Sequence, residues 1–181
     1  MDRRQIKTQA QIKQVFIHLL AQQPLDKITV AQLAATADIN RGTFYHHYRD
    51  IYDLHDQIVA GLIRDMTQIF SQNYPTTTDN HAILKALSHQ LVTYIDTQQD
   101  TVAVLLRQPT IGAVVFQQVK AAFIQKACAL ELTLPNNIPD KLEINFIVSG
   151  IMGLVMDFVT QALAISATTL EQHIYALLRK F

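Results

Sequence analysis

Residues 28–48 read ITVAQLAATADINRGTFYHHY, and this stretch predicts two short helices separated by a four-residue turn. Thr29 followed by Gln32 has the form of a capping box, in which the hydroxyl accepts an otherwise unpaired N–H and the glutamine reaches back. Asp38 tolerates the left-handed conformation that a tight turn requires. Asn40 is a suitable N-cap for the second helix, residues 41–48. Together with the longer helix that precedes it, the stretch predicts a helix-turn-helix.

The side chains of this stretch divide into an inner and an outer set. Apolar residues stand where the two helices must pack together: Val30, Leu33, Ala34, Ala37 and Ile39. Phe44 and Tyr48 are four residues apart, so they share one face of the second helix and are predicted to point inward. The remaining residues of that helix are predicted to face outward: Arg41, Thr43, Tyr45, His46 and His47.

The outer set has suitable chemistry for binding DNA, because the second helix of such a unit enters the major groove. Arg41 can form a bidentate contact with guanine, and Tyr and His side chains can donate to base edges or phosphates. Gly42 permits a close backbone approach. Thr29 at a helix N-terminus can offer its hydroxyl and N–H to a phosphate oxygen. Sequence-independent charge would come from three residues of the first helix: Arg3, Arg4 and Lys7.

Residues 8–55 resemble the DNA-binding domain of the TetR/AcrR family of transcriptional regulators, most specifically in Gly-Thr-Phe-Tyr-x-His-Tyr. The resemblance implies an all-helical homodimer that binds a palindromic operator and carries a C-terminal domain for dimerisation and a small-molecule effector. At matching positions the family's DNA contacts correspond to Thr29, Arg41, Gly42, Thr43, Tyr45, His46 and His47. Asp38 replaces the usual turn glycine. Ile51 replaces a lysine that commonly touches phosphate, and Arg49 is the candidate substitute.

Nearly every other segment has the helical period, which predicts an all-α fold of about nine helices. The N-terminal part is expected to span residues 1–50 and the helical ligand-binding and dimerisation part residues 51–181. The helices are expected at about 4–22, 29–37 and 41–48, then from an Asp50 cap onward, and at 79–98, 101–107, 110–131, 140–165 and 169–180. A buried face is predicted for the fourth: Leu54, Ile58, Leu62, Met66 and Ile69. Thr168 and Glu171 suggest a capping box for the last.

The composition agrees with a folded DNA-binding protein of the cytoplasm. The 181 residues are 49% hydrophobic and 17% charged, which excludes a disordered chain. Residues 1–50 carry seven Lys or Arg and four Asp or Glu, whereas residues 51–181 carry eight and eleven, so the N-terminal part is basic. The start lacks the apolar run of a secretory signal. The single cysteine, Cys128, is interpreted as a buried inert thiol rather than a redox sensor.

The predicted helix 140–165 is apolar almost all round, and polar residues interrupt it too often for a membrane span. A helix of this kind favours an intersubunit four-helix bundle formed with the last helix, although packing within one chain is an alternative. The dimer interface would then contain Gly150, Gly153, Leu154, Phe158, Leu170, Ile174, Leu177 and Leu178.

Polar groups inside the apolar helices are candidates for contacts to an effector: His89, Tyr94, Arg107, Asn145, Asp157 and Gln161. Asp157 must be paired, neutralised, exposed or directed into a pocket, because an unpaired buried carboxylate is costly. A cationic ligand or Arg107 would satisfy it, and an exposed position is equally compatible.

No catalytic motif, cofactor motif or metal-ligand spacing accompanies these features. His46, His47 and His55 do not form a plausible metal site, because adjacent helical residues point about 100° apart. The sequence therefore predicts a DNA-binding transcriptional regulator rather than an enzyme, with repression as the expected mode and an effector that moves the fourth helix. The alternative is a helical interaction or ligand-binding module that has lost operator binding.

Overall fold

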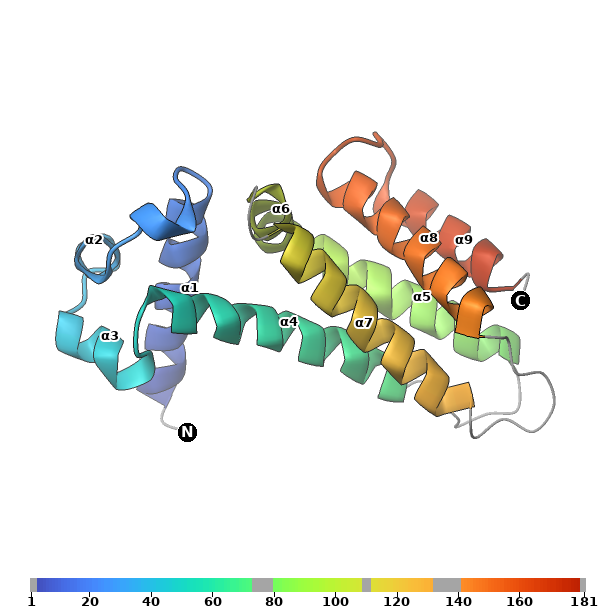
Figure 1. The fold of residues 1–181 in the computed structure, drawn as a ribbon, viewed down its shortest axis with the longest axis horizontal. Coiled ribbons are helices and arrows are strands. Elements are labelled where there is room, and N and C mark those ends of the chain that lie inside the picture. The colour runs from blue at the N-terminus through green and yellow to red at the C-terminus, as the bar shows by residue number, and fades with distance from the viewer. Residues whose placement is uncertain (1–2, 73–79, 109–111, 132–140, 180–181) are drawn as a thin grey trace. The chain divides into compact units, whose positions relative to one another are not determined.

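A computed structural model describes residues 3–72, 80–108, 112–131 and 141–179, and all regular structure within these ranges is helical. Within these described ranges the nine α-helices are α1 (Arg3–Leu20), α2 (Val30–Thr36), α3 (Arg41–His47), α4 (Ile51–Gln72), α5 (Asn80–Thr97), α6 (Gln99–Arg107), α7 (Gly112–Glu131), α8 (Lys141–Val159) and α9 (Ala167–Leu178). A short 3₁₀ turn, Leu25–Lys27, follows α1 (Figure 1). The predicted all-α fold is confirmed.

The chain divides into two compact units, Met1–Leu62 and Ile63–Phe181. The division falls inside α4, a continuous helix that contributes residues to both units. The functional boundary that the sequence predicts is at residue 50. This residue does not lie at the division between the two compact units but in the loop directly before α4. There Asp50 caps the helix as predicted, since its Oδ1 accepts the N–H of Asp53 at 2.8 Å.

The N-terminal unit is a three-helix arrangement in which α1 packs against α2, and α2 packs against α3. Apolar residues of α1 recur at helical spacing and are buried: Ile12, Phe16, Leu19 and Leu20. They share the core with Leu33, Phe44, Tyr48 and Leu54, each at most 2% exposed. This small core fixes the position of α3, the helix that the sequence predicts to read DNA.

The C-terminal unit consists of the end of α4 and helices α5 to α9. In it α5 packs against α9, α7 against α8, and α8 also against α6 and α9. Among the described residues, the most completely buried apolar side chains of this unit are Ile95, Leu105, Leu170 and Ile174. Over Leu142–Val159, α8 is long and apolar enough to cross a membrane, a property that core helices of soluble proteins share. Cys128 belongs to α7, and its side chain lies outside the described residues.

Two predicted helix ends in this unit were wrong. The helix expected to run to residue 165 ends at Val159, because Gln161 adopts a left-handed conformation with φ of 62°. The N–H of Leu163 then donates to the carbonyl of Asp157 at 3.1 Å, which closes the helix C-terminus. The cap of α9 is Ser166, whose hydroxyl accepts the N–H of Thr169 at 3.1 Å, and not the predicted Thr168 box.

Candidate nucleic-acid interface

The turn between α2 and α3 is held by backbone contacts and by one side chain of α1. Asp38 has the predicted left-handed conformation, with φ of 50°. The N–H of Ile39 donates to the carbonyl of Ala34 at 3.0 Å, and Gln11 Nε2 donates to the carbonyl of Ala37 at 2.7 Å. The turn is therefore tied both to α2 and to α1, which fixes the direction in which α3 leaves it.

The two predicted helix caps differ in outcome. Thr29 caps α2 as expected, since its Oγ1 accepts the N–H of Gln32 at 3.1 Å. The side chain of Gln32 does not reach back, because its Oε1 accepts Gln23 Nε2 at 2.8 Å. Asn40 occupies the N-cap position of α3 without the predicted side-chain bond, and its carbonyl accepts the N–H of Thr43 at 2.9 Å. Both cap residues are exposed at the helix N-termini.

The predicted inward face of α3 is confirmed. Phe44 is 0% exposed and Tyr48 2% exposed, and their ring centroids are 5.6 Å apart. Burial, together with the neighbouring Asp53 carboxylate, raises the pKa of Tyr48. The two rings anchor α3 in the core and oblige the rest of the helix to face outward.

The outer face of α3 carries exposed polar and aromatic groups. Arg41 and His46 are exposed, Tyr45 is 57% exposed, and Thr43 is half-buried. His47 is also half-buried, with its Nδ1 3.4 Å from Gln9 Nε2 of α1. The pKa of His47 is lowered below 6.5, mainly by burial and secondly by the neighbouring His46. His47 therefore has a supporting contact inside the unit that its outward assignment did not anticipate.

Gly42 leaves an opening on this face. A Cβ placed at this residue would meet no atom within 4 Å, so the absence of a side chain serves no packing need within the chain. A backbone left bare at an exposed helix allows another molecule to approach closely.

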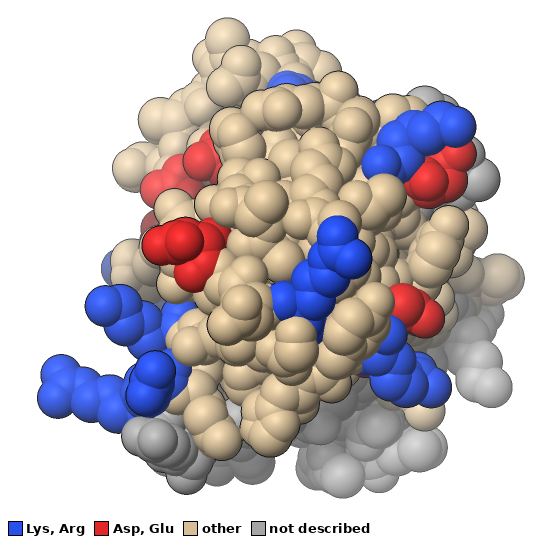
Figure 2. Space-filling view, turned by 90° about the vertical axis from the view of Figure 1, so that its left-hand side faces the viewer, with Lys and Arg blue, Asp and Glu red and all other residues tan. Residues whose placement is uncertain are grey.

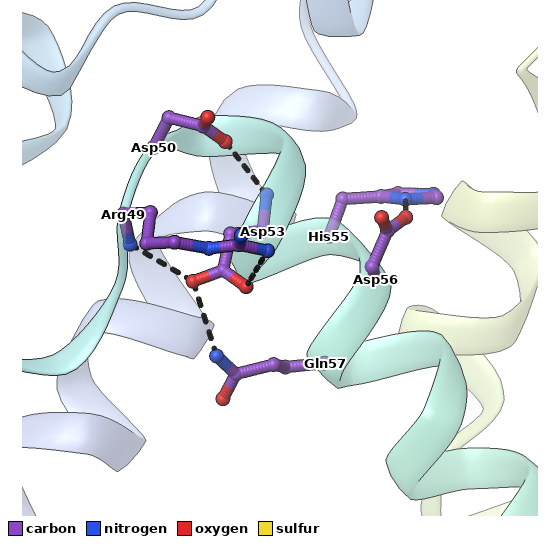
Figure 3. Close-up of polar contacts among 6 residues, drawn as sticks. All are labelled: Arg49, Asp50, Asp53, His55, Asp56 and Gln57. Atoms are coloured by element: carbon purple, nitrogen blue, oxygen red, sulfur yellow. Dashed lines mark hydrogen bonds and ion pairs between the residues drawn. The ribbon is translucent and has the colours of Figure 1, made fainter.

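The segment between α3 and α4 is organised by Asp53 (Figure 3). Its Oδ2 accepts the N–H of Arg49 at 2.8 Å and Gln57 Nε2 at 3.2 Å, while its Oδ1 lies 3.3 Å from the Arg49 guanidinium. These contacts, of which the backbone bond is the largest, lower the pKa of Asp53. The carboxylate thus links the loop that follows α3 to the first turn of α4.

Basic groups of the N-terminal unit are spread over its surface. Arg3, Arg4, Arg41 and Arg49 are exposed, and the guanidinium-bearing side chain of Arg49 is 87% exposed despite its pairing with Asp53. Figure 2 shows the side on which α2 and α3 lie in Figure 1, and Lys and Arg project there at several separate places. Ile51, interpreted from the sequence as a replacement for a phosphate-contacting lysine, is 5% exposed and belongs to the core.

Sequence reasoning missed two groups near α3. Tyr52 is 55% exposed at the start of α4, next to the predicted contact Arg49. Asp53 organises the loop, as described above. The signal for Tyr52 was the presence of an aromatic residue next to Ile51 in the sequence. The spacing of four residues from Arg49 to Asp53, typical of an ion pair on one helical turn, was a signal for the second.

The polar residues predicted to contact an effector lie outside the cavity that the structure shows in the C-terminal unit. This cavity has a volume of about 130 Å³ and is lined by side chains of α4, α5, α7, α8 and α9. His89 pairs with Glu171 at 3.0 Å, Tyr94 with Asp65 at 3.4 Å, and Arg107 donates to the Thr160 carbonyl at 3.3 Å. The other three are exposed: Asn145, Asp157 and Gln161. A role for these six residues in ligand binding stays a prediction.

The residues predicted for a dimer interface fall into two groups. Gly150 is exposed, and Gly153, Leu154, Leu177 and Leu178 are half-buried. Phe158, Leu170 and Ile174 are buried within the single chain, so their apolar surface is already covered. Sequence reasoning missed the two most exposed apolar side chains of α8, Leu142 at 75% and Phe146 at 72%.

Comparison with known proteins supplies the context for this geometry. Residues 17–58 match the profile of a family described as bacterial regulatory proteins, tetR family. No curated protein sequence matches the chain.

Several solved structures have a similar fold. One is a TetR-family transcriptional regulator from Syntrophomonas wolfei, with 11% identity, a TM-score of 0.77, and coverage of 96% of this chain and 94% of that chain. Another is the fatty acid degradation regulator FadR from Bacillus halodurans, with 17% identity, a TM-score of 0.73, and coverage of 94% and 93%. A third is a TetR regulator from Streptococcus agalactiae, with 21% identity, a TM-score of 0.62, and coverage of 98% and 96%.

Proposed function

We propose that this chain is a DNA-binding transcriptional regulator of the TetR/AcrR family and that it acts as a cytoplasmic repressor. It acts as a homodimer on a palindromic operator and is released by a small molecule bound in the C-terminal unit. The helices α3 of the two subunits enter successive major grooves, roughly 34–36 Å apart or a multiple of that distance.

The division of α3 into a buried and an exposed face carries the DNA-binding part of the proposal. Phe44 and Tyr48 fix α3 in the core, so the outer residues of this helix are held in position without packing against other side chains themselves. Arg41 makes the base contact, and Gly42 lets the helix backbone approach the groove. Tyr45, His46 and the hydroxyl of Thr43 supply further donors. Thr29, at the N-terminus of α2, binds a phosphate together with backbone N–H groups.

The exposed apolar stripe of α8 supports the dimer. Leu142, Phe146 and Gly150 are spaced four residues apart, which places them along one side of the helix, and all three are exposed. Gly153 and Leu154 continue this side with half-buried positions. A contiguous apolar surface of this kind favours an interface, and small residues allow two helices to approach closely.

Helix α4 contributes residues to both units, and this supports a coupling between ligand binding and operator binding. Leu54 belongs to the core of the N-terminal unit, and Met66 of the same helix lines the cavity of the C-terminal unit. A ligand that moves Met66 therefore acts on a helix that also holds the DNA-reading unit. Release requires the ligand to bind more tightly to the form that does not bind DNA.

Selection of random duplex DNA on the purified protein tests this function, with affinity for the selected sequence measured at two salt concentrations. A palindromic consensus is expected, with affinity that falls steeply as salt rises because several phosphates are contacted. A stoichiometry of two chains per operator is expected from sedimentation. An asymmetric or single half-site consensus would contradict the dimer. The absence of any consensus sequence would contradict the repressor.

The second candidate function is a helical interaction module without operator binding. The burial of Ile51 favours it, because one phosphate contact common in the family is lost, and so does the scattered distribution of basic groups. Weak DNA binding that is indifferent to salt would support this module.

A matched pair of variants tests the dimer separately. Phe146→Glu introduces a charge into the exposed stripe of α8, whereas Val114→Glu does the same at a 54%-exposed residue of α7. Only the first is expected to give a monomer in sedimentation. Equal behaviour of the two variants would contradict an interface on α8.

A further inference from the structure

The cavity of the C-terminal unit is built almost entirely from hydrocarbon side chains. Leucine, isoleucine, valine, methionine and phenylalanine residues supply all but one of its lining positions, and no charged side chain of the described residues lines it. Most of the lining comes from α5 and α8, including Leu91, Val148 and Ile151. A charged ligand placed here would lose its hydration without gaining a partner, which is costly.

Among the described residues that line the cavity, Ser88 is the single polar one, and its hydroxyl hydrogen is already used in a hydrogen bond. Its side chain is 0% exposed, and its hydroxyl donates to the carbonyl of Leu84 one turn earlier in α5 at 2.8 Å. Only the oxygen lone pairs remain, and they can accept one hydrogen bond from a ligand. A carboxylate, which needs donors, therefore finds none in this lining.

The size of the cavity sets the size of the ligand. Its volume of about 130 Å³ is close to that of an apolar cavity of about 150 Å³ that stays dry and binds benzene or xenon. A buried water needs two to four polar partners, and one serine oxygen does not provide them. An apolar molecule that enters displaces no well-bound water and gains contacts with the whole lining.

We propose that this cavity binds an uncharged apolar molecule of roughly six to eight carbon atoms, and that this is the class of effector to which the chain responds. The second half of this inference rests on the proposed function, and the first half does not. Met66 and Met152 line the cavity from α4 and α8. Their flexible thioether side chains can adjust to ligands of different outline. Met66 carries the response, because it belongs to α4.

Three probes of nearly equal shape and different charge test the ligand class: toluene, benzoate and benzylamine. The full-length protein carries ¹³C-labelled methionine methyl groups, so that NMR reports on Met66 and Met152 directly. Toluene is expected to shift both resonances and, at ten times its Kd, to raise the Tm by about 3–5 °C. Benzoate and benzylamine are expected to bind at least tenfold more weakly. Equal binding of either charged probe would overturn the assigned ligand class.

A cavity-filling variant tests the location. Val148→Phe places a ring in the cavity and is expected to abolish the toluene shifts at Met66 and Met152, whereas Val114→Phe at an exposed residue of α7 keeps them. Xenon binding to the unmodified protein, followed by ¹²⁹Xe NMR, gives the same information without a substitution. Toluene shifts that persist unchanged in a folded Val148→Phe protein would overturn the site, as would absence of xenon binding.

Operator affinity measured on the same samples separates this inference from the proposed function. Toluene binding accompanied by weaker operator binding supports both. Toluene binding with unchanged operator affinity supports the cavity and overturns the apolar effector. Selective operator binding without any toluene binding overturns the cavity inference and leaves the DNA-binding function in place.

Discussion

Both units of this chain are built from helices, but the helices of each unit serve a different purpose. In the N-terminal unit, a short helix directs its chemistry outward: Tyr45 is 57% exposed beside Phe44, which is 0% exposed. In the C-terminal unit, longer helices face one another across a cavity lined by apolar side chains such as Leu91 and Val148. In the proposed function, the first unit offers polar groups to DNA, and the second offers an apolar space to a small molecule.

The difference shows that rigidity is needed at different places in the two units. A DNA contact is specific only if the side chain that makes it is held, so the core under α3 must be complete. A cavity, in contrast, is a place where the core is incomplete, and its lining must tolerate rearrangement. Substitutions in the N-terminal unit should therefore separate stability from DNA binding cleanly, in a way that substitutions around the cavity will not.

The largest expected effect comes from breaking the core under α3. Phe44→Ala removes a completely buried ring, which costs about 3–5 kcal/mol in protein cores. A unit of this size has little stability to spare. We expect α1 to α3 to lose amide hydrogen-exchange protection and operator binding to vanish, while α5 to α9 keep their protection.

The neighbouring residue supplies the control. Tyr45→Ala removes a similar ring from an exposed position, so the stability of the N-terminal unit should change by no more than about 0.5 kcal/mol. Loss of protection throughout the chain in Phe44→Ala would show that the two units unfold together, and the contrast between them would then be limited to function.

The second effect separates reading from folding. Arg41→Ala is expected to cost about 1–3 kcal/mol of operator binding and to relax the preference at one base pair, with little change in Tm. Arg41→Lys keeps the positive charge and loses the bidentate geometry, so it should retain the salt dependence and lose the base preference. Unchanged specificity in both variants would assign Arg41 to phosphate instead of base.

The sequence was a good guide to the N-terminal unit for a physical reason. A helix that must be anchored on one side and polar on the other shows this requirement in its pattern, so the inward position of Phe44 and Tyr48 and the exposure of Arg41 followed from spacing alone. The left-handed Asp38 was likewise predictable, because few residue types tolerate that conformation.

The cavity was not predictable by the same means. Its lining consists of residue types that also fill ordinary cores, so periodicity cannot distinguish Leu91 at a cavity from Leu105 in a packed core. Polar residues such as His89 were conspicuous in sequence, yet they pair at the surface with residues distant in the chain, here Glu171. The end of α8 at Val159 also depended on a left-handed Gln161, a residue type that gives no such signal.

The third effect compares two glycines, one in each unit. A Cβ at Gly42 or at Gly150 would meet no atom within 4 Å, so alanine at either should stabilise its helix by about 0.5–1 kcal/mol. Gly42→Ala should nevertheless weaken operator binding several-fold, because the added methyl group stands where the DNA approaches. Gly150→Ala should leave DNA contacts intact and weaken self-association. Chemical denaturation, operator titration and sedimentation measure the three quantities.

If Gly42→Ala binds operator as tightly as the unmodified protein, the backbone of α3 does not approach the DNA closely, and Gly42 has no role in recognition. Gly112→Ala serves as the opposite control, because its Cβ would overlap the Leu106 carbonyl oxygen, and it should destabilise the packing of α7 against α6.

The smallest effect concerns His47, an outward residue of α3 whose imidazole contacts Gln9 on α1. Burial first, and the charge of His46 second, lower the pKa of His47 below 6.5. Between the lowered value and 6.5 the unfolded chain binds a proton at this residue that the folded unit does not bind. The stability contributed by neutral His47 is therefore complete above pH 6.5 and is lost as the pH falls through that window.

Titration of the imidazole resonances by NMR checks both causes. We expect His47 to titrate below 6.5, and His46→Gln to raise its pKa only part of the way back, since burial remains when the neighbouring charge is removed. Full recovery to 6.5 in His46→Gln would make the charge the dominant cause, and titration at or above 6.5 in the unmodified protein would contradict the burial of the ring. In the second case Gln9 would not hold His47 against α1, and both histidines would be equally available to DNA.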